Sequence, residues 1–207
     1  MESIKNLIRR LKKKRKLIRM TIVGDGAVGK TTLVQAMLKY TKFNGNSFNL
    51  YSENLEKINR TPFMEIESWN YRDLQIQCFD LAGQRTVGSH PLDILRDQVV
   101  KSIDIYIFVF SLNRFESFEN LQNWLELCLD EGTKKLQRDK NNQIGLILVG
   151  NKADLDKNVP EELINPVVGE NKYFNEYIET SAIKGIGIKE LLDTIGEIGK
   201  KLLNLNE

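Results

Sequence analysis

Residues 24–32 read Gly24-Asp25-Gly26-Ala27-Val28-Gly29-Lys30-Thr31-Thr32, and this stretch decides the fold. It is a complete G-x-x-x-x-G-K-[ST] phosphate-binding motif between the apolar run ending at Val23 and a helical pattern starting near Leu33. Its glycines let backbone N–H groups converge on phosphate oxygens at a helix N-terminus. We therefore predict a nucleoside triphosphate site in which Lys30 reaches the outer phosphates and Thr31 binds Mg2+. We predict that the other nucleotide-binding residues of the loop are Gly26, Ala27, Val28, Gly29 and Thr32.

Length and composition indicate one α/β domain with a sizeable core. The chain has 207 residues, of which 41% are hydrophobic and 28% charged. Its longest apolar run, residues 105–110, is too short to span a bilayer and suits a buried strand. Cys78 and Cys128 lack metal-ligand spacing, which indicates reduced thiols in a reducing compartment. With no secretory signal in view, we expect a cytoplasmic protein that reaches membranes only peripherally.

Apolar β-rich runs alternate with helical patterns, as in βαβ units. We predict strands over residues 17–23, 64–70, 74–81, 103–111, 144–150 and 177–181, and helices over 30–39, 91–101, 115–131, 160–168 and 188–204. The expected fold is a mostly parallel six-stranded sheet with helices on both faces. Residues 64–81 should form a hairpin that turns near Arg72. The polar residues 40–60 read as a long functional loop.

A second motif, Asp80-Leu81-Ala82-Gly83-Gln84, follows the predicted strand 74–81. An Asp at that strand end faces the phosphate loop and can hold magnesium. The Gly83 N–H can approach a terminal phosphate, and Gln84 can orient an attacking water. The D-x-x-G pattern is weak alone, but it is informative downstream of a phosphate loop.

A third motif, Asn151-Lys152-Ala153-Asp154, follows the buried run ending at Gly150. The Asp154 carboxylate can accept hydrogen bonds from the N1–H and exocyclic amine of guanine, an edge that adenine does not offer. The Lys152 stem can lie over the base, and Asn151 can tie this loop to the phosphate loop. Ser181-Ala182 after the last strand adds a backbone N–H for guanine O6.

Together these motifs resemble the Ras-like small GTPases, a group of P-loop NTPases, over roughly residues 17–204. The stretches 95–98, 108–113 and 117–120 are similar to Ras and Rab proteins, and Arg60-Thr61-Pro62-Phe63 is closest to the Rho first switch. The resemblance implies a slow GTPase switch that binds GTP or GDP with Mg2+. It implies that Thr61 binds the metal and senses the γ-phosphate. It also implies catalytic roles for Gln84, Lys30 and Thr61, and regulators and effectors that bind the switch regions.

The chain also departs from that family. The first switch is expanded, so the aromatic beside guanine is left open among Phe43, Phe48 and Tyr51. The second switch is longer and carries Arg85, which we interpret as solvated rather than catalytic. The printed C-terminal residues lack a cysteine, so we expect no prenylation.

The first twenty residues hold nine Lys or Arg against Glu2 alone, a charge of +8. Since the whole chain carries +2, the remainder carries −6. We divide the chain into a basic arm, 1–16, and a GTPase domain, 17–207. Apolar residues of the arm fall at helical spacing (Ile4, Leu7, Ile8 and Leu11), which suits an anionic membrane surface. A nuclear localisation signal, a nucleic-acid patch and docking on its own domain stay open.

The leading hypothesis is a monomeric GTP-hydrolysing switch of signalling or trafficking type, for which nucleic acid is not the expected partner. A hydrolysis-deficient guanine-nucleotide-binding interaction module is the alternative, favoured by the altered switches. Gln84, Asp80 and Thr31 argue against it. An ATPase is poorly compatible with Asp154, because a carboxylate selects guanine.

Overall fold

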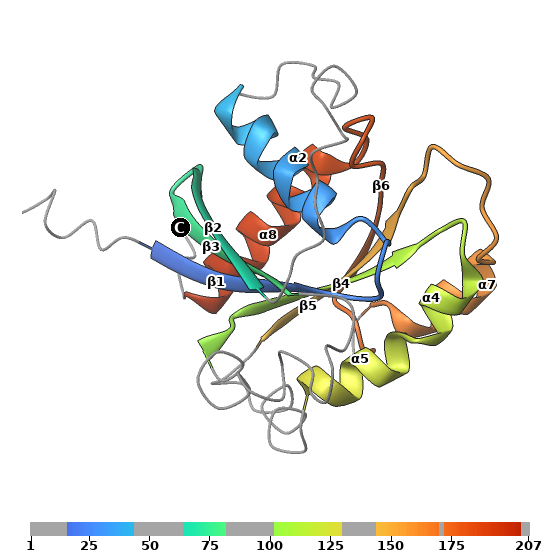
Figure 1. Ribbon diagram of the computed structural model, residues 1–207. Helices are drawn as coiled ribbons and strands as arrows, with labels where there is room; N and C mark the ends of the chain where they lie inside the picture. The colour runs from blue at the N-terminus through green and yellow to red at the C-terminus, as the bar shows by residue number, and fades with distance from the viewer. Residues whose placement is uncertain (1–15, 44–63, 82–101, 130–143, 170–171, 204–207) are drawn as a thin grey trace, which may run out of the picture.

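The computed structural model describes residues 16–43, 64–81, 102–129, 144–169 and 172–203 (Figure 1). Its centre is a six-stranded sheet with strand order β2-β3-β1-β4-β5-β6. All neighbouring strands are parallel except β2 and β3, which form an antiparallel hairpin. This architecture confirms the predicted α/β fold with a mostly parallel sheet.

The strand bounds follow the apolar runs closely. The strands are β1 Lys16–Val23, β2 Met64–Tyr71, β3 Leu74–Leu81, β4 Ile105–Ser111, β5 Gly145–Asn151 and β6 Glu176–Thr180. Every residue of β4 and β5 is buried, because both faces of these central strands are covered. The hairpin turns where predicted, with Arg72 in the left-handed region at φ 52°.

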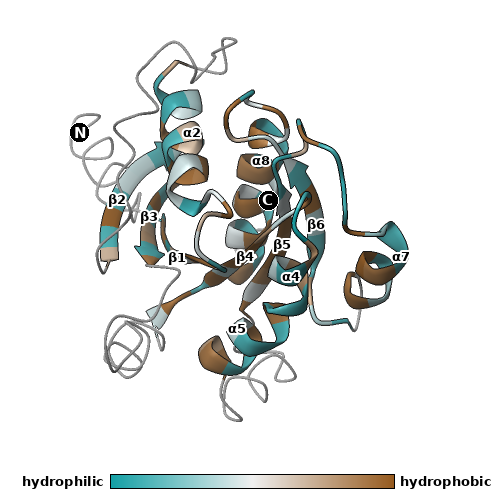
Figure 2. Cartoon of the chain, turned by 45° about the vertical axis from the view of Figure 1, so that its right-hand side comes forward, coloured by the Kyte–Doolittle hydropathy of each residue, from teal (hydrophilic) through white to brown (hydrophobic). Residues whose placement is uncertain are grey.

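Helices lie on both faces of the sheet (Figure 1). One face carries α2 Lys30–Lys42 and α8 Ile188–Leu202, which share one hydrophobic cluster with β1. The other carries α4 Phe115–Glu119, α5 Leu121–Cys128 and α7 Glu161–Ile164, which belong to a second cluster. The mixed colours of α5 and α8 in Figure 2 reflect helices with one apolar and one polar side.

Two predicted helices are shorter or broken in the structure. The helix expected over 115–131 divides at Asn120, whose side chain turns toward the phosphate loop, and α5 ends at Cys128. The helix expected over 160–168 continues after Ile164 only as a 3-10 turn, Asn165–Val167, because Pro166 has no N–H for an α-helical bond.

Several predictions concern residues outside the described ranges. These are the basic arm up to residue 15, Thr61 and the rest of the first switch, Gly83 and Gln84, and the helix expected over 91–101. Within the described ranges, no helix is long and apolar enough to cross a membrane.

Candidate nucleotide-binding site

The predicted site residues gather at one edge of the sheet. Parallel strands point their carboxyl ends to the same edge, so the ends of β1, β3, β5 and β6 lie along one side of the sheet. The phosphate loop follows β1, Asp80 lies near the end of β3, and Asn151 ends β5. The described residues of three motifs far apart in sequence therefore lie in one region.

Backbone geometry in the phosphate loop explains its glycines. Gly24 has φ 143°, and a Cβ there would lie 2.1 Å from the carbonyl oxygen of Val109. Gly29 has φ 95°, and a Cβ there would lie 2.5 Å from Asn151 Nδ2. Ala27 also adopts a positive φ, 62°. The loop thus packs tightly against β4 and Asn151 before α2 begins at Lys30.

Lys30 is buried beneath this loop. Its Nζ donates to the carbonyl oxygens of Gly24 at 2.8 Å and Asp25 at 2.9 Å. Burial lowers the pKa of Lys30 to about 8, although Asp80 and Asp25 act to raise it. The ammonium is therefore desolvated, and the two acceptors that hold it are neutral backbone carbonyls, which suits a cation that meets phosphate oxygens.

Thr31 and Asp80, the predicted magnesium ligands, lie in direct contact. The Thr31 hydroxyl donates to Asp80 Oδ2 at 2.6 Å, and Asp80 is 2% exposed. Hydroxyl and carboxylate oxygens are hard donors that suit Mg2+. Among the described residues no group of three or more His, Cys, Asp or Glu side chains is placed to hold a metal. These donors therefore fit a magnesium ion that takes further ligands from phosphate and water.

Asn151 joins the base side to the phosphate side. Its Nδ2 donates to the Val28 carbonyl at 2.9 Å. Its Oδ1 accepts from the Thr180 hydroxyl at 3.0 Å and from the Ala182 N–H at 3.2 Å. All of these contacts are buried, so one amide fixes three loops in place. The Ala182 N–H, expected to face guanine O6, is directed to Asn151 Oδ1 here.

Asp154 and Lys152 form the predicted base-recognition pair. The Ser181 hydroxyl donates to Asp154 Oδ1 at 2.5 Å and itself accepts from the Lys184 N–H. Lys152 adopts φ 66°, and burial followed by the Arg114 charge lowers its pKa. Ser181, which directly follows β6, thus orients one oxygen of the Asp154 carboxylate.

The sequence profile of the Ras family matches residues 19–200 of this chain. The chain belongs to the Ras family. Its similarity to individual members is broad but distant. It is 29% identical to the Ras-related protein Rab7 of Pisum sativum, covering 89% of this chain and 83% of that one. It is 26% identical to the Ras-like protein rasU of Dictyostelium discoideum, covering 87% and 74%.

A third relative carries a different subfamily name. The ADP-ribosylation factor-like protein 2 of Dictyostelium discoideum is 24% identical over 91% of both chains. Ras-like, Rab and Arf-like names thus occur at similar identity. The family assigns the chain to the small GTPase switches in general, and these distant similarities do not select a subfamily.

Some site residues of this Ras-family protein lie outside the described ranges. Thr61, Gly83 and Gln84 are among them, as are two candidate aromatics, Phe48 and Tyr51. The third candidate, Phe43, ends α2 with 52% of its surface exposed. Thr32 is half-buried in the first turn of α2. The assignments of these residues stay predictions.

Sequence reasoning missed a set of residues around the phosphate loop. Thr180 holds Asn151, and Asp25 is contacted by Arg114, Asn120 and Trp124. Asp25 is the acidic residue of the motif, but its partners are remote in sequence. The one feature of the sequence that could have indicated these partners is an acidic residue in a loop predicted to bind anions.

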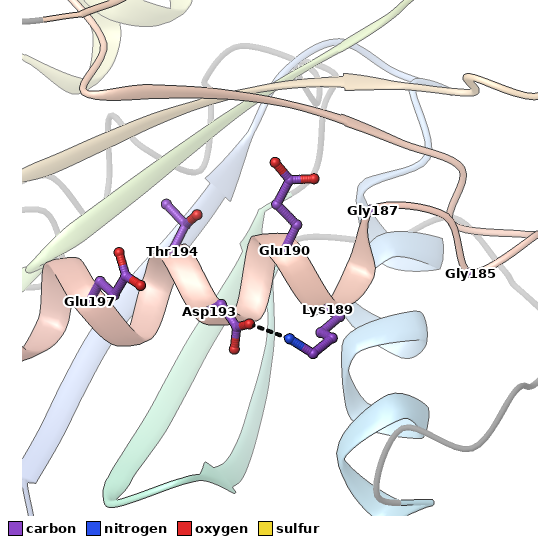
Figure 3. Close-up of a pocket in the computed structure, with 7 residues that line it drawn as sticks. All are labelled: Gly185, Gly187, Lys189, Glu190, Asp193, Thr194 and Glu197. Atoms are coloured by element: carbon purple, nitrogen blue, oxygen red, sulfur yellow. Dashed lines mark hydrogen bonds and ion pairs between the residues drawn. The ribbon is translucent and has the colours of Figure 1, made fainter.

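A separate groove follows the exposed side of α8 (Figure 3). It runs from Gly185 and Gly187 past Glu190 to Glu197, and Lys189 and Asp193 pair within it at 2.7 Å. None of its lining residues belongs to the predicted nucleotide site. Its acidic side chains disfavour a phosphate ligand, so the groove adds nothing to the nucleotide site.

Proposed function

We propose that this protein is a GTP-binding switch that slowly hydrolyses GTP to GDP and phosphate. The carrying observation is the Asn151 carboxamide, which ties the Asp154 loop to the phosphate loop through Val28. Base selection by Asp154 and phosphate binding by Lys30 then act on one ligand. Membership of the Ras family supports this reading.

The described residues supply binding and charge stabilisation. Lys30 is held by two backbone carbonyls and can transfer its hydrogen bonds to phosphate oxygens when a nucleotide enters. Thr31 and Asp80 would hold Mg2+, which when bound supplies positive charge at the phosphate oxygens. Asp154 would accept from guanine, with Lys152 over the base and Ser181 fixing the carboxylate.

The hydrolytic and switching parts rest on residues beyond the described ranges. Gln84 would orient the attacking water, Gly83 would donate its N–H to the terminal phosphate, and Thr61 would bind the metal and report the γ-phosphate. By family resemblance, Gly26 would leave room for Gln84 and for an arginine from an activating protein. Regulators and effectors would then distinguish the GTP and GDP states through the two switches.

Nucleotide identity is the first test. Nucleotide released from the purified protein should be GTP or GDP. Asp154→Asn replaces an acceptor by an amide, so it should weaken guanine nucleotide and favour xanthine, which has a carbonyl in place of the exocyclic amine. Glu190→Gln, a surface carboxylate in the α8 groove, is the matched control. Bound ATP or ADP, or unchanged base preference in Asp154→Asn, would overturn the base assignment.

Hydrolysis is the second test. Single-turnover GTP hydrolysis by the wild-type chain should be slow, on the order of 10⁻⁴ to 10⁻² per second, and slower still in Gln84→Leu. Gln122→Leu, on the exposed side of α5, is the control for a surface glutamine. Turnover absent from the wild type while GTP remains bound would favour the alternative, a nucleotide-locked interaction module.

The arm formed by residues 1–16 is proposed to bind anionic membranes. Its charge and apolar spacing support this role, and a signalling or trafficking switch uses membrane surfaces. Flotation with vesicles containing phosphatidylserine should retain the full chain and lose a chain without residues 1–16. Equal flotation would discard the membrane role.

Size-exclusion chromatography with light scattering should give a monomer.

A further inference from the structure

Asp25, the second residue of the phosphate loop, is held by donors from a helix on the opposite face of the sheet from α2. Its Oδ2 accepts from Asn120 Nδ2 at 2.8 Å, and its Oδ1 accepts from Trp124 Nε1 at 2.9 Å. Asn120 is the N-cap residue of α5, and Trp124 lies one turn further along. Each carboxylate oxygen therefore has its own donor from α5.

Arg114 reinforces the same part of the loop. Its Nη2 donates to the Gly26 carbonyl at 2.9 Å and lies 3.9 Å from Asp25 Oδ2. The Arg114 backbone is itself fixed, because its carbonyl accepts from the Ser117 hydroxyl at 2.7 Å. Two successive residues of the loop, Asp25 and Gly26, are thus anchored by side chains that follow β4.

The anchored residues are the ones on which the Lys30 ammonium rests. Lys30 Nζ donates to the Asp25 carbonyl at 2.9 Å, while the Asp25 side chain is turned toward α5. Any rotation of the Asp25 peptide would move both the Lys30 acceptor and the Gly26 backbone. Hydrogen bonds to a charged acceptor are strong enough to hold such a loop in place.

We propose that Asp25 is a positioning residue that couples α5 to the nucleotide phosphates through Asn120 and Trp124. Its carboxylate does not contact the nucleotide. It holds the loop backbone in the conformation that binds phosphate, so a change of the loop on nucleotide binding would reach α5 through Asp25. This inference rests on the proposed function, because it concerns the same nucleotide site.

The two donors on separate oxygens provide a sharp genetic test. Asp25→Asn is nearly isosteric, but the two donors approach different oxygens of Asp25, so when the amide oxygen accepts from Trp124 its NH2 group faces Asn120 Nδ2. Asn120→Asp alone places two carboxylates together. The double variant Asp25→Asn with Asn120→Asp exchanges donor and acceptor and keeps the Trp124 bond. The loop should recover only in the double variant.

Release of a fluorescent GDP analogue from the full chain is the measurement. Asp25→Asn and Asn120→Asp should each release it roughly 10- to 100-fold faster than the wild type, and the double variant should recover to within about threefold. Gln122→Ala, on the exposed side of the same helix, should release it at the wild-type rate. Thermal unfolding without nucleotide would identify a single variant that does not fold. In that case the release rate of the double variant tests the proposal.

The fluorescence of Trp124 also reports on the coupling, because a contact with a purely structural role would not change it on nucleotide binding. The chain has two tryptophans, and Trp69→Phe leaves Trp124 as the single reporter. In that background, Trp124 emission should change on GDP binding, and the change should disappear in Asp25→Asn. A silent Trp124, or a double variant as fast as its worse parent, would overturn the inference. Wild-type protein that binds no guanine nucleotide would instead overturn the proposed function.

Discussion

The buried Lys30 predicts that nucleotide affinity falls as pH rises through the mildly alkaline range. Desolvation lowers the pKa of Lys30 to about 8 in the free protein. Phosphate groups at its Nζ would raise that pKa again, so nucleotide binding takes up a proton once Lys30 has lost its own. The affinity should therefore be constant below the pKa of the free protein and decline above it.

The magnitude follows from the protonated fraction. For a pKa of about 8, this fraction falls from about 0.9 near pH 7 to about 0.1 near pH 9. If only the ammonium form binds phosphate, the dissociation constant rises about tenfold over that interval, or about 1.4 kcal/mol. The free energy of unfolding changes in the opposite direction. Because the pKa of Lys30 is lower in the folded protein, keeping the buried ammonium charged destabilises the fold at low pH. This cost is relieved as pH rises from about 8 toward the ordinary pKa of 10.5.

Titration with a fluorescent GDP analogue across this range is the assay, with Lys30→Arg as the matched control. A guanidinium stays charged throughout, so the variant should lack the decline even if its affinity is weaker at every pH. Ionisation of guanine itself affects both proteins equally and cancels in their ratio. A ratio that does not change between about pH 7 and about pH 9 would refute the buried-ammonium argument.

Three further substitutions test the packing. Gly29→Ala puts a Cβ against Asn151 Nδ2 at φ 95°, so nucleotide affinity should fall at least about tenfold and the free energy of unfolding by about 1–3 kcal/mol; wild-type binding would contradict the clash. Asn151→Ala removes the hydrogen-bond partner of the buried Thr180 hydroxyl and of the Val28 carbonyl. The free energy of unfolding in urea should therefore fall by about 2–4 kcal/mol, and a decrease below about 1 kcal/mol would contradict a bridging role for Asn151. Tyr71→Phe removes the hydrogen bond that ties the β2–β3 hairpin to Asp193 of α8, so stability should drop by about 1 kcal/mol with nucleotide affinity unchanged, and altered affinity would show that the hairpin communicates with the site.

Local patterns predicted the elements that depend on neighbours in sequence. β3 has its predicted bounds, 74–81, because turn residues and an apolar run define it on their own. The hairpin turn near Arg72 is local in the same way. The division of the predicted helix 115–131 at Asn120 could not be predicted, because its side chain binds Asp25, 95 positions away.

The sequence by itself was enough to predict the ligand chemistry that we propose for this protein. The residues from Gly24 to Thr32 are contiguous, and their spacing, flanked by a strand and a helix, is sufficient to indicate phosphate and magnesium. Asp154 is predicted to be a guanine acceptor for the same reason, since it lies in one short motif.

Only the tertiary structure decided which residues hold the phosphate loop in its conformation. Asn151 binds Val28 across 123 positions, and Trp124 binds Asp25 across 99. Such pairs meet because parallel strands deliver their carboxyl ends to one edge of the sheet, and the side chains that follow them then become neighbours. No local spacing encodes that meeting, because it depends on the order of the strands in the sheet.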